Sequence, residues 1–201
     1  MSNSSSDHHD GLIPIHDHIP MPEELWSFET GKPMLNCVEC GRDLSPDGTP
    51  YLIEKARHGT EVIAEFAWCF ECHDATQESY SKESRTRIWD YFLDRVSFED
   101  RRRRLSQHHR CDLAAWTSAC VTCGKPAAEC KETLTLAQAD GGDLMFHYLP
   151  YLICGECCEA IVDLMSNPSL DAWHDWLQQN LPMAPEAQAL PRSRSRNLLL
   201  I

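Results

Sequence analysis

The sequence lacks any run of about 18 apolar residues, the length that a membrane-spanning helix requires. It also lacks a basic stretch followed by an apolar core near its start, where MSNSSSDHHDG is polar and acidic. We therefore expect a soluble protein of the cytoplasm with no membrane partner. In that compartment reduced cysteines bind metal ions more often than they form disulfides.

Positive charge is scarce, since 18 lysines and arginines stand against 31 aspartates and glutamates and the formal net charge is −13. A chain this acidic repels a phosphate backbone unless it carries a well-segregated basic face. The dense basic run is Arg101 to Arg104, followed by His108, His109 and Arg110. A solvated linker is the commoner origin of such a run, so nucleic-acid binding through Arg101–Arg104 is an alternative hypothesis and not the leading one.

Eight of the eleven cysteines form four Cys-x2-Cys pairs. The pairs are Cys37 with Cys40, Cys69 with Cys72, Cys120 with Cys123, and Cys154 with Cys157. The first and third pairs are offset by 83 residues, and the second and fourth by 85. At the offset of 85 the similarity continues beyond the cysteines, because Ser81 matches Ser166 and Tyr91 matches Trp176. We infer that one unit is written twice.

This repeat predicts an α+β protein made of two tandem zinc-stapled units. We expect a disordered N-terminal tail at 1–22, a first unit at 23–98, a basic helical linker at 99–119, a second unit at 120–183 and a disordered C-terminal tail at 184–201. The N-terminal tail carries His8, His9, His16 and His18 among aspartates, and we expect these side chains to stay solvated.

Each unit is predicted to run from a Cys-x2-Cys-Gly turn through a β-hairpin and a short helix to a longer helix. In the first unit we expect strands at 49–58 and 60–69 and helices at 69–80 and 81–96. In the second we expect strands at 132–140 and 144–154 around a Gly-Gly turn, and helices at 155–165 and 169–181. The linker is predicted to be helical through 98–108, and residues 111–116 to form a short helical or extended connector.

The cysteine spacing is suited to zinc, which in structural sites takes four tetrahedral ligands and binds thiolates well. Two Cys-x2-Cys pairs supply four thiolates, and the hairpin of 28 or 30 residues between them brings the pairs together. Four protein ligands leave no open position on the metal, which a catalytic zinc would need. The eight thiolates add −8 and two divalent ions add +4, so the net charge of −13 would become −17.

The segments CVECG…CFEC and CVTCG…CGEC resemble the treble-clef group of zinc folds, and zinc ribbons have similar spacing. The resemblance covers about 37–74 and 120–160. It implies that one zinc ion is bound by Cys37, Cys40, Cys69 and Cys72, and a second by Cys120, Cys123, Cys154 and Cys157. Treble clefs serve many roles, so the resemblance does not name a function.

Two further types of chemistry remain open for these cysteines. CGEC between an apolar strand and a helix looks like the active-site setting of thioredoxin-like proteins, which makes Cys154 and Cys157 a candidate thiol redox pair. Two Cys-x2-Cys pairs also bind iron in rubredoxin. Outside the pairs, Cys111 and Cys130 are expected to be reduced thiols, while His73 and Cys158 occupy matching places and are candidates for alternative ligands.

The leading functional hypothesis is a non-enzymatic, structural zinc-binding protein that acts as a protein-interaction or scaffold module. It is supported by the acidic charge, by the lack of a plausible catalytic cluster, and by four tryptophans, a residue enriched at interfaces. These are Trp89, Trp116, Trp173 and Trp176. Packing of the two longer helices against each other would give the repeats a pseudo-twofold arrangement.

Overall fold

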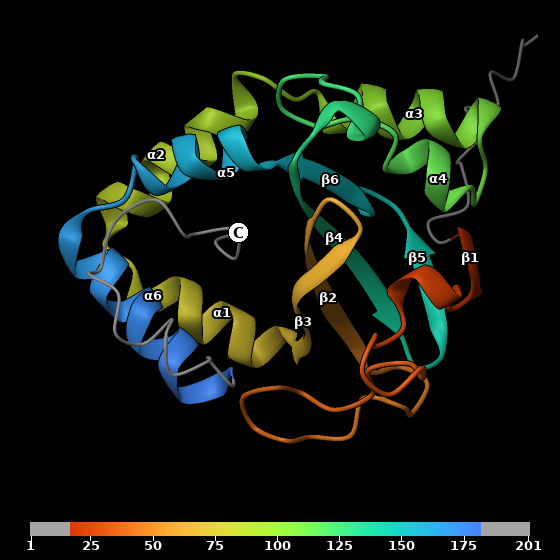
Figure 1. Ribbon diagram of the computed structural model, residues 1–201, viewed down its shortest axis with the longest axis horizontal. Coiled ribbons are helices and arrows are strands. Elements are labelled where there is room, and N and C mark those ends of the chain that lie inside the picture. The colour runs from red at the N-terminus through yellow and green to blue at the C-terminus, as the bar shows by residue number, and fades with distance from the viewer. Residues whose placement is uncertain (1–16, 182–201) are drawn as a thin grey trace, which may run out of the picture.

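The computed structural model describes residues 17–181, which form an α+β fold with one six-stranded antiparallel sheet (Figure 1). The strands are β1 (Asp17–Pro20), β2 (Pro50–His58), β3 (Glu61–Cys69), β4 (Glu132–Asp140), β5 (Asp143–Phe146) and β6 (Tyr151–Cys154). The helices are α1 (Phe70–Ser79), α2 (Lys82–Leu93), α3 (Phe98–His108), α4 (Leu113–Trp116), α5 (Gly155–Val162) and α6 (Asn167–Asn180), with short 3-10 turns at Glu23–Leu25 and Ala127–Glu129. The predicted fold class and the order of elements in both repeats are confirmed.

Two local predictions are wrong. The strand expected at 144–154 is interrupted, because β5 and β6 pair separately with β4 and residues 147–150 leave the sheet between them. Pro150 stands at that break and has no backbone N–H to donate to a ladder. The disordered tail expected through residue 22 also ends earlier, since β1 pairs with β5 along four residues.

Tertiary contacts explain why this polar N-terminal segment is a strand. Nε of Arg110 donates to Oδ2 of Asp17 at 2.9 Å, and Nδ1 of His18 lies 2.6 Å from Oδ2 of Asp143. His18 therefore has a partner, but its side chain is 57% exposed, which agrees with the solvated state expected for it. The other three tail histidines and the predicted C-terminal tail at 184–201 lie outside the described residues.

The two hairpins join into one sheet through a pseudo-twofold arrangement. Strand β2 pairs antiparallel with β4 along all nine of its residues. At the centre of this pairing Glu54 faces Leu136. The two are repeat equivalents, because Tyr51 pairs with Cys69 as Thr133 pairs with Cys154, which offsets β4 from β2 by 82 residues. A residue that pairs with its own repeat equivalent marks the axis, so the pseudo-twofold axis passes between Glu54 and Leu136.

A second contact on this axis joins the first turns of the two longer helices. The backbone N–H of Ser81 donates to Oγ of Ser169 at 2.9 Å, and that of Ser166 donates to Oγ of Ser84 at the same distance. Ser84 and Ser169 are buried, at 1% and 0% exposed. Each helix thus satisfies a backbone donor at the start of the other, a role usually filled within one helix.

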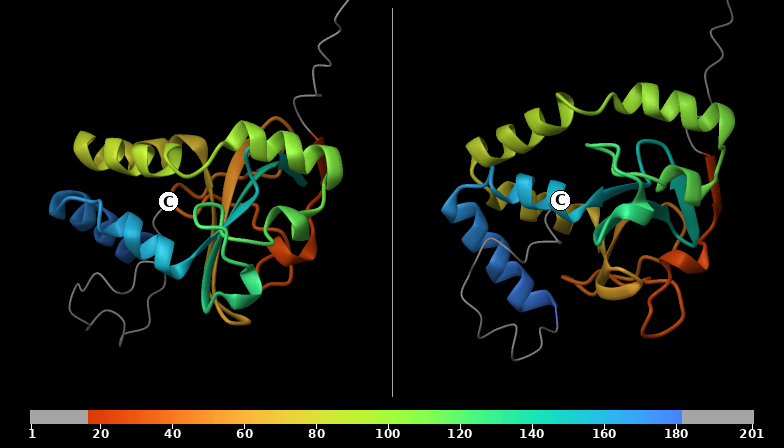
Figure 2. Two further views of the ribbon diagram at one scale, coloured as in Figure 1. Left: turned by 90° about the horizontal axis from the view of Figure 1, so that it is seen from above. Right: turned by 45° about the horizontal axis from the view of Figure 1, so that its top comes forward.

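The repeats exchange their longer helices beyond this contact. The ring centroids of Trp176 on α6 and Trp68 on β3 lie 5.0 Å apart, so the second repeat's helix packs on the first repeat. The ring of Phe92 on α2 lies 6.5 Å from that of Tyr151 on β6, and Phe92 belongs to the core cluster of the second repeat. Figures 1 and 2 show α1, α2, α5 and α6 gathered on one side of the sheet.

The expected packing of the two longer helices is therefore found at their N-terminal ends, while the rest of each helix covers the opposite repeat. The unit ranges 23–98 and 120–183 stay a prediction, since the two repeats share a sheet and a core and do not pack as separate bodies.

Glu54 is a buried carboxyl at the centre of this shared core. It is 1% exposed, and neither of its carboxylate oxygens has a hydrogen-bond partner within residues 17–181. Burial raises the pKa of Glu54 well above its usual range, because the charged form is poorly solvated there. The repeat equivalent, Leu136, is buried and apolar. The fold therefore accepts an apolar residue at this place on the axis.

Replacing Glu54 by leucine is expected to raise the free energy of unfolding at neutral pH. In the unfolded chain the carboxyl ionises above about pH 4.3, whereas in the folded chain it stays protonated until its raised pKa is reached. Between these values the unfolded chain binds fewer protons, so the stability of the wild type falls as pH rises, by up to about 1.4 kcal/mol per unit. Urea unfolding at several pH values should show a shallower slope for Glu54→Leu, and an unchanged slope would contradict this role.

Candidate metal centres

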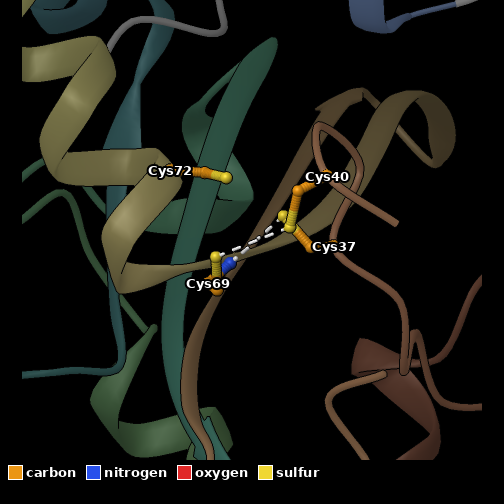
Figure 3. Close-up of side chains that lie close together, drawn as sticks. All are labelled: Cys37, Cys40, Cys69 and Cys72. Atoms are coloured by element: carbon orange, nitrogen blue, oxygen red, sulfur yellow. Dashed lines mark hydrogen bonds between the residues drawn. The ribbon is translucent and has the colours of Figure 1, made fainter. Parts of the chain in front are cut away.

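The first centre is built from a tight turn and a helix start (Figure 3). Gly41 has a φ of +71°, which glycine adopts at little cost, and its N–H donates to the carbonyl of Cys37 at 2.9 Å. The N–H of Val38 donates to the carbonyl of Ala67 at 2.8 Å and ties this turn to β3. Cys69 ends β3 and caps α1, and Cys72 lies in the first turn of α1. The four side chains point toward one another in Figure 3.

The second centre repeats this construction. Gly124 has a φ of +75°, and its N–H donates to the carbonyl of Cys120 at 2.9 Å. Cys154 ends β6 and caps α5, which carries Cys157 in its first turn. All eight predicted ligands thus fall into the two predicted groups of four.

The sulfur positions fit a tetrahedral ion. Within each group the four Sγ atoms lie within 4.8 Å of one another. Sγ of Cys40 is 3.9 Å from Sγ of Cys69, and Sγ of Cys123 is 3.7 Å from Sγ of Cys154. Four sulfurs at about 2.3 Å from a central zinc would be about 3.8 Å apart. Both groups are therefore positioned to bind a metal ion.

Backbone donors stabilise one thiolate in each group. The N–H of Cys69 donates to Sγ of Cys37, and that of Cys154 to Sγ of Cys120, both at 3.4 Å. Burial opposes ionisation of Cys120, but hydrogen bonds from Thr122 and from backbone N–H groups lower its pKa to about 7. For Cys154, burial and the neighbouring charge of Cys120 raise the pKa. Four thiolates in one group therefore require a cation among them.

An ion pair joins the turn to the helix at each centre. Nη1 of Arg42 lies 2.9 Å from Oε1 of Glu71, and Nζ of Lys125 lies 2.6 Å from Oε1 of Glu156. The bond to Lys125 lowers the pKa of Glu156 to about 2. Neither ion pair was predicted from the sequence. In both repeats the cation follows the second turn cysteine by two residues, and the carboxylate follows the helix-capping cysteine by two residues. This matched spacing was the sequence signal for the two ion pairs.

The exchanged helices reach the cysteine turns of the opposite repeat. Nε1 of Trp176 on α6 donates to Oε2 of Glu39, inside the CVECG turn, at 2.8 Å. At the other centre, burial and the adjacent Cys157 raise the pKa of Tyr91 on α2 to about 12. Trp176 and Tyr91 are repeat equivalents, so each metal centre is covered by a helix from the other repeat. Glu39 was not predicted as a contact residue. The available signal was that it occupies the one position at which the two CVxCG turns differ.

The two alternative ligand candidates, His73 and Cys158, lie outside both sulfur groups, as does the expected reduced thiol Cys130. His73 packs edge-on against Trp68, with ring centroids 5.0 Å apart, and its Nδ1 is 3.1 Å from Oδ1 of Asp74. Cys158 is buried in the second core, and burial raises its pKa. Sγ of Cys130 donates to the carbonyl of Pro126 at 3.3 Å. These contacts give each residue a packing role.

The proposed redox pair does not have the environment of an attacking thiol. Cys154 and Cys157 are 1% and 8% exposed, and an attacking cysteine must be accessible. The raised pKa of Cys154 also disfavours the thiolate that attacks a disulfide. Strand β6 runs antiparallel to β4, whereas a thioredoxin-like redox motif is expected near a βαβ unit. The geometry therefore favours the metal-binding role for these two thiols.

Three of the four arginines in the run on α3 have partners, one in the interior and two in intrahelical ion pairs. Arg101 donates to the carbonyls of Trp116, Pro150 and Tyr148, at 2.6, 2.9 and 3.2 Å. Burial lowers the pKa of Arg101 to about 10, which leaves it charged at neutral pH. Arg102 pairs with Glu99 and Arg103 with Asp100. Arg103 and Arg104 are the exposed members of the run.

Arg101 is expected to matter for stability. The change Arg101→Met keeps most of the apolar packing but leaves three carbonyls without their charged donor. Because hydrogen bonds to charged groups contribute about 1.5 to 3 kcal/mol each, we expect the free energy of unfolding to fall by about 3 kcal/mol. The exposed neighbour Arg104 is the control, and Arg104→Met should cost less than about 0.5 kcal/mol. Equal effects in urea denaturation would contradict the structural role.

Among residues 17–181, no helix is both long enough and apolar enough to cross a membrane. No protein-family model, curated protein or solved structure matches this chain. The assignment of the two metal centres therefore rests on their own geometry.

Proposed function

We propose that this protein is a non-enzymatic protein-interaction or scaffold module of the cytoplasm whose fold is held by two structural Zn²⁺ ions. Cys37, Cys40, Cys69 and Cys72 would hold one ion, and Cys120, Cys123, Cys154 and Cys157 the other. Bound zinc would supply cross-links and charge neutralisation between the turn and the helix of each repeat.

One observation carries this proposal: each centre offers four thiols and is covered by a helix of the opposite repeat. A catalytic zinc keeps a position for water or substrate, and a complete set of four protein ligands leaves none. At the first centre the bond from Trp176 to Glu39 holds α6 against the cysteine turn, and the sulfur ligands Cys37 and Cys69 are buried. Such a site stabilises a fold and has no place for a reacting group.

Zinc is proposed over iron because structural zinc sites take four tetrahedral ligands and bind thiolates well, as both groups of four cysteines provide. The treble-clef resemblance supports the same choice, since a Cys-x2-Cys-Gly turn, a hairpin and a helix-opening Cys-x2-Cys occur here in that order. The acidic surface favours protein partners over nucleic acid, and the ion pairs on α3 weaken the nucleic-acid alternative.

Cobalt substitution tests the closed character of both sites. Protein refolded with two equivalents of Co²⁺ should show the visible absorption of tetrahedral cobalt thiolate centres. Because no position on the metal is open, imidazole or a small thiol should leave this spectrum unchanged. A spectrum that shifts on adding such a ligand would show an exchangeable position and contradict the structural assignment. The zinc-loaded protein, assayed for bound metal, serves as the control for correct refolding.

A further inference from the structure

The outer face of α2 carries two exposed apolar side chains one turn apart. Trp89 is 65% exposed and Leu93 is 56% exposed. The other three tryptophans suggested by the sequence as interface residues, Trp116, Trp173 and Trp176, are buried in the core. Figures 1 and 2 show α2 along the outer edge of the helical side of the molecule. We use the name α2 face for Trp89 and Leu93 together with the charged residues Lys82, Arg85, Asp90 and Asp94.

The second repeat shows that the fold does not require these apolar residues. At the offset of 85 residues, Trp89 corresponds to His174 and Leu93 to Gln178 on α6. The same element of the same fold therefore tolerates polar side chains at both positions. An exposed tryptophan beside an exposed leucine, absent from the equivalent helix, indicates a contact made outside the monomer.

The four charged side chains of α2 and its C-cap that lack an ion-pair partner are segregated along the helix. Lys82 and Arg85 lie in its N-terminal half, Asp90 and Asp94 at its C-terminal end, and none of the four has an ion-pair partner within residues 17–181. Neighbouring charges are engaged, since Arg87 pairs with Glu83 and Arg95 lies over the Tyr91 ring. The order of these four unpaired charges opposes the helix dipole, which favours anions at the N-terminus and cations at the C-terminus.

We propose that the α2 face binds the α2 face of a second copy of this chain, with the two helices antiparallel. In that arrangement the cationic half of each helix approaches the anionic half of the other, and Trp89 and Leu93 lie between them. A twofold contact joins the same surface of both copies, so that surface must be complementary to itself. A helix with opposite charges at its two ends meets this requirement. The contact names a first protein partner and so rests on the proposed interaction function.

Sedimentation velocity over a range of concentrations tests the proposal, with bound zinc measured in every sample. The wild type should reach twice the 22.9 kDa mass of one chain. The double variant Trp89→His with Leu93→Gln, which copies the second repeat, should weaken dimerisation by about thirtyfold or more. Phe28→Gln, which removes a side chain that is 77% exposed elsewhere, is the matched control and should dimerise normally.

Charge reversal distinguishes the antiparallel contact from other dimers. Lys82→Glu with Arg85→Glu makes the α2 face acidic, and Asp90→Lys with Asp94→Lys makes it basic. Each variant alone should be monomeric, and an equimolar mixture should recover the dimer. A monomeric wild type, a dimer unaffected by Trp89→His with Leu93→Gln, or a mixture that stays monomeric would each overturn the proposal.

The zinc measurement separates the two proposals. A monomer that holds two zinc ions refutes this contact and leaves the structural zinc role in place. Loss of zinc in the wild type refutes that role itself.

Discussion

Replacing Cys69 by serine is expected to unfold the whole chain and not the first repeat alone. A structural zinc ion contributes about 10 kcal/mol or more to folding, which is comparable to the whole stability of a domain. Because β2 pairs with β4 along its full length, the second repeat loses its neighbouring strand when the first unfolds. It also loses α2, whose Phe92 packs in its core. Far-UV circular dichroism should show loss of structure throughout.

Metal content gives the second readout of this experiment. The Cys69→Ser protein should lose the ion of the first centre, and a mild chelator should remove the ion of the second far faster than from the wild type. Cys130→Ser is the control, because Cys130 lies outside both sulfur groups, and it should keep both ions. Half of the helical signal together with one tightly held ion would show that the repeats fold independently.

Replacing Ser169 by valine is expected to lower the free energy of unfolding by about 3 kcal/mol. The buried Oγ of Ser169 accepts from the N–H of Ser81 and donates to Oγ of Ser84 at 3.0 Å. A buried donor left without a partner costs about 1 to 3 kcal/mol, and valine adds a methyl group in a fully buried place. Ser118→Val, at an exposed serine, should change stability by less than about 0.5 kcal/mol.

A double-mutant cycle shows whether the two helix starts act together. Ser84→Val breaks the reciprocal bond to the N–H of Ser166 at 2.9 Å, so it should cost about as much as Ser169→Val. Because the two hydroxyls contact each other, the double variant should lose less than the sum of the single losses. Additive losses would mean that the serines stabilise their own helices separately.

The sequence predicted the local chemistry of this fold because that chemistry depends on neighbouring residues. The Cys-x2-Cys-Gly turns, the hairpin after each turn and the helix opened by each second pair are short-range patterns. The repeat spacing then placed Cys37 and Cys154 in separate groups, each with four thiols. The strand break at Pro150 could also have been predicted from the proline. The apolar residues on both sides of it led instead to the prediction of one continuous strand.

The exchange of the longer helices could not be predicted in the same way. A stripe containing Phe92 or Trp176 shows that one face of a helix is buried, but not which repeat supplies the partner. Strand β1 shows the same limit, because its pairing with β5 and its contact with Arg110 join residues about a hundred positions apart. The polar segment around Asp17 carries no local signal for a strand.

Native mass spectrometry of untagged protein, combined with thiol alkylation before and after chelation, is the sharpest test of the two-centre structure. This structure predicts two zinc ions per chain. It also predicts that the eight paired cysteines resist alkylation until a chelator removes the ions, while Cys111 reacts earlier because it is only partly buried. One ion per chain, no ion, or eight freely reactive thiols in the folded protein would contradict the two-centre structure.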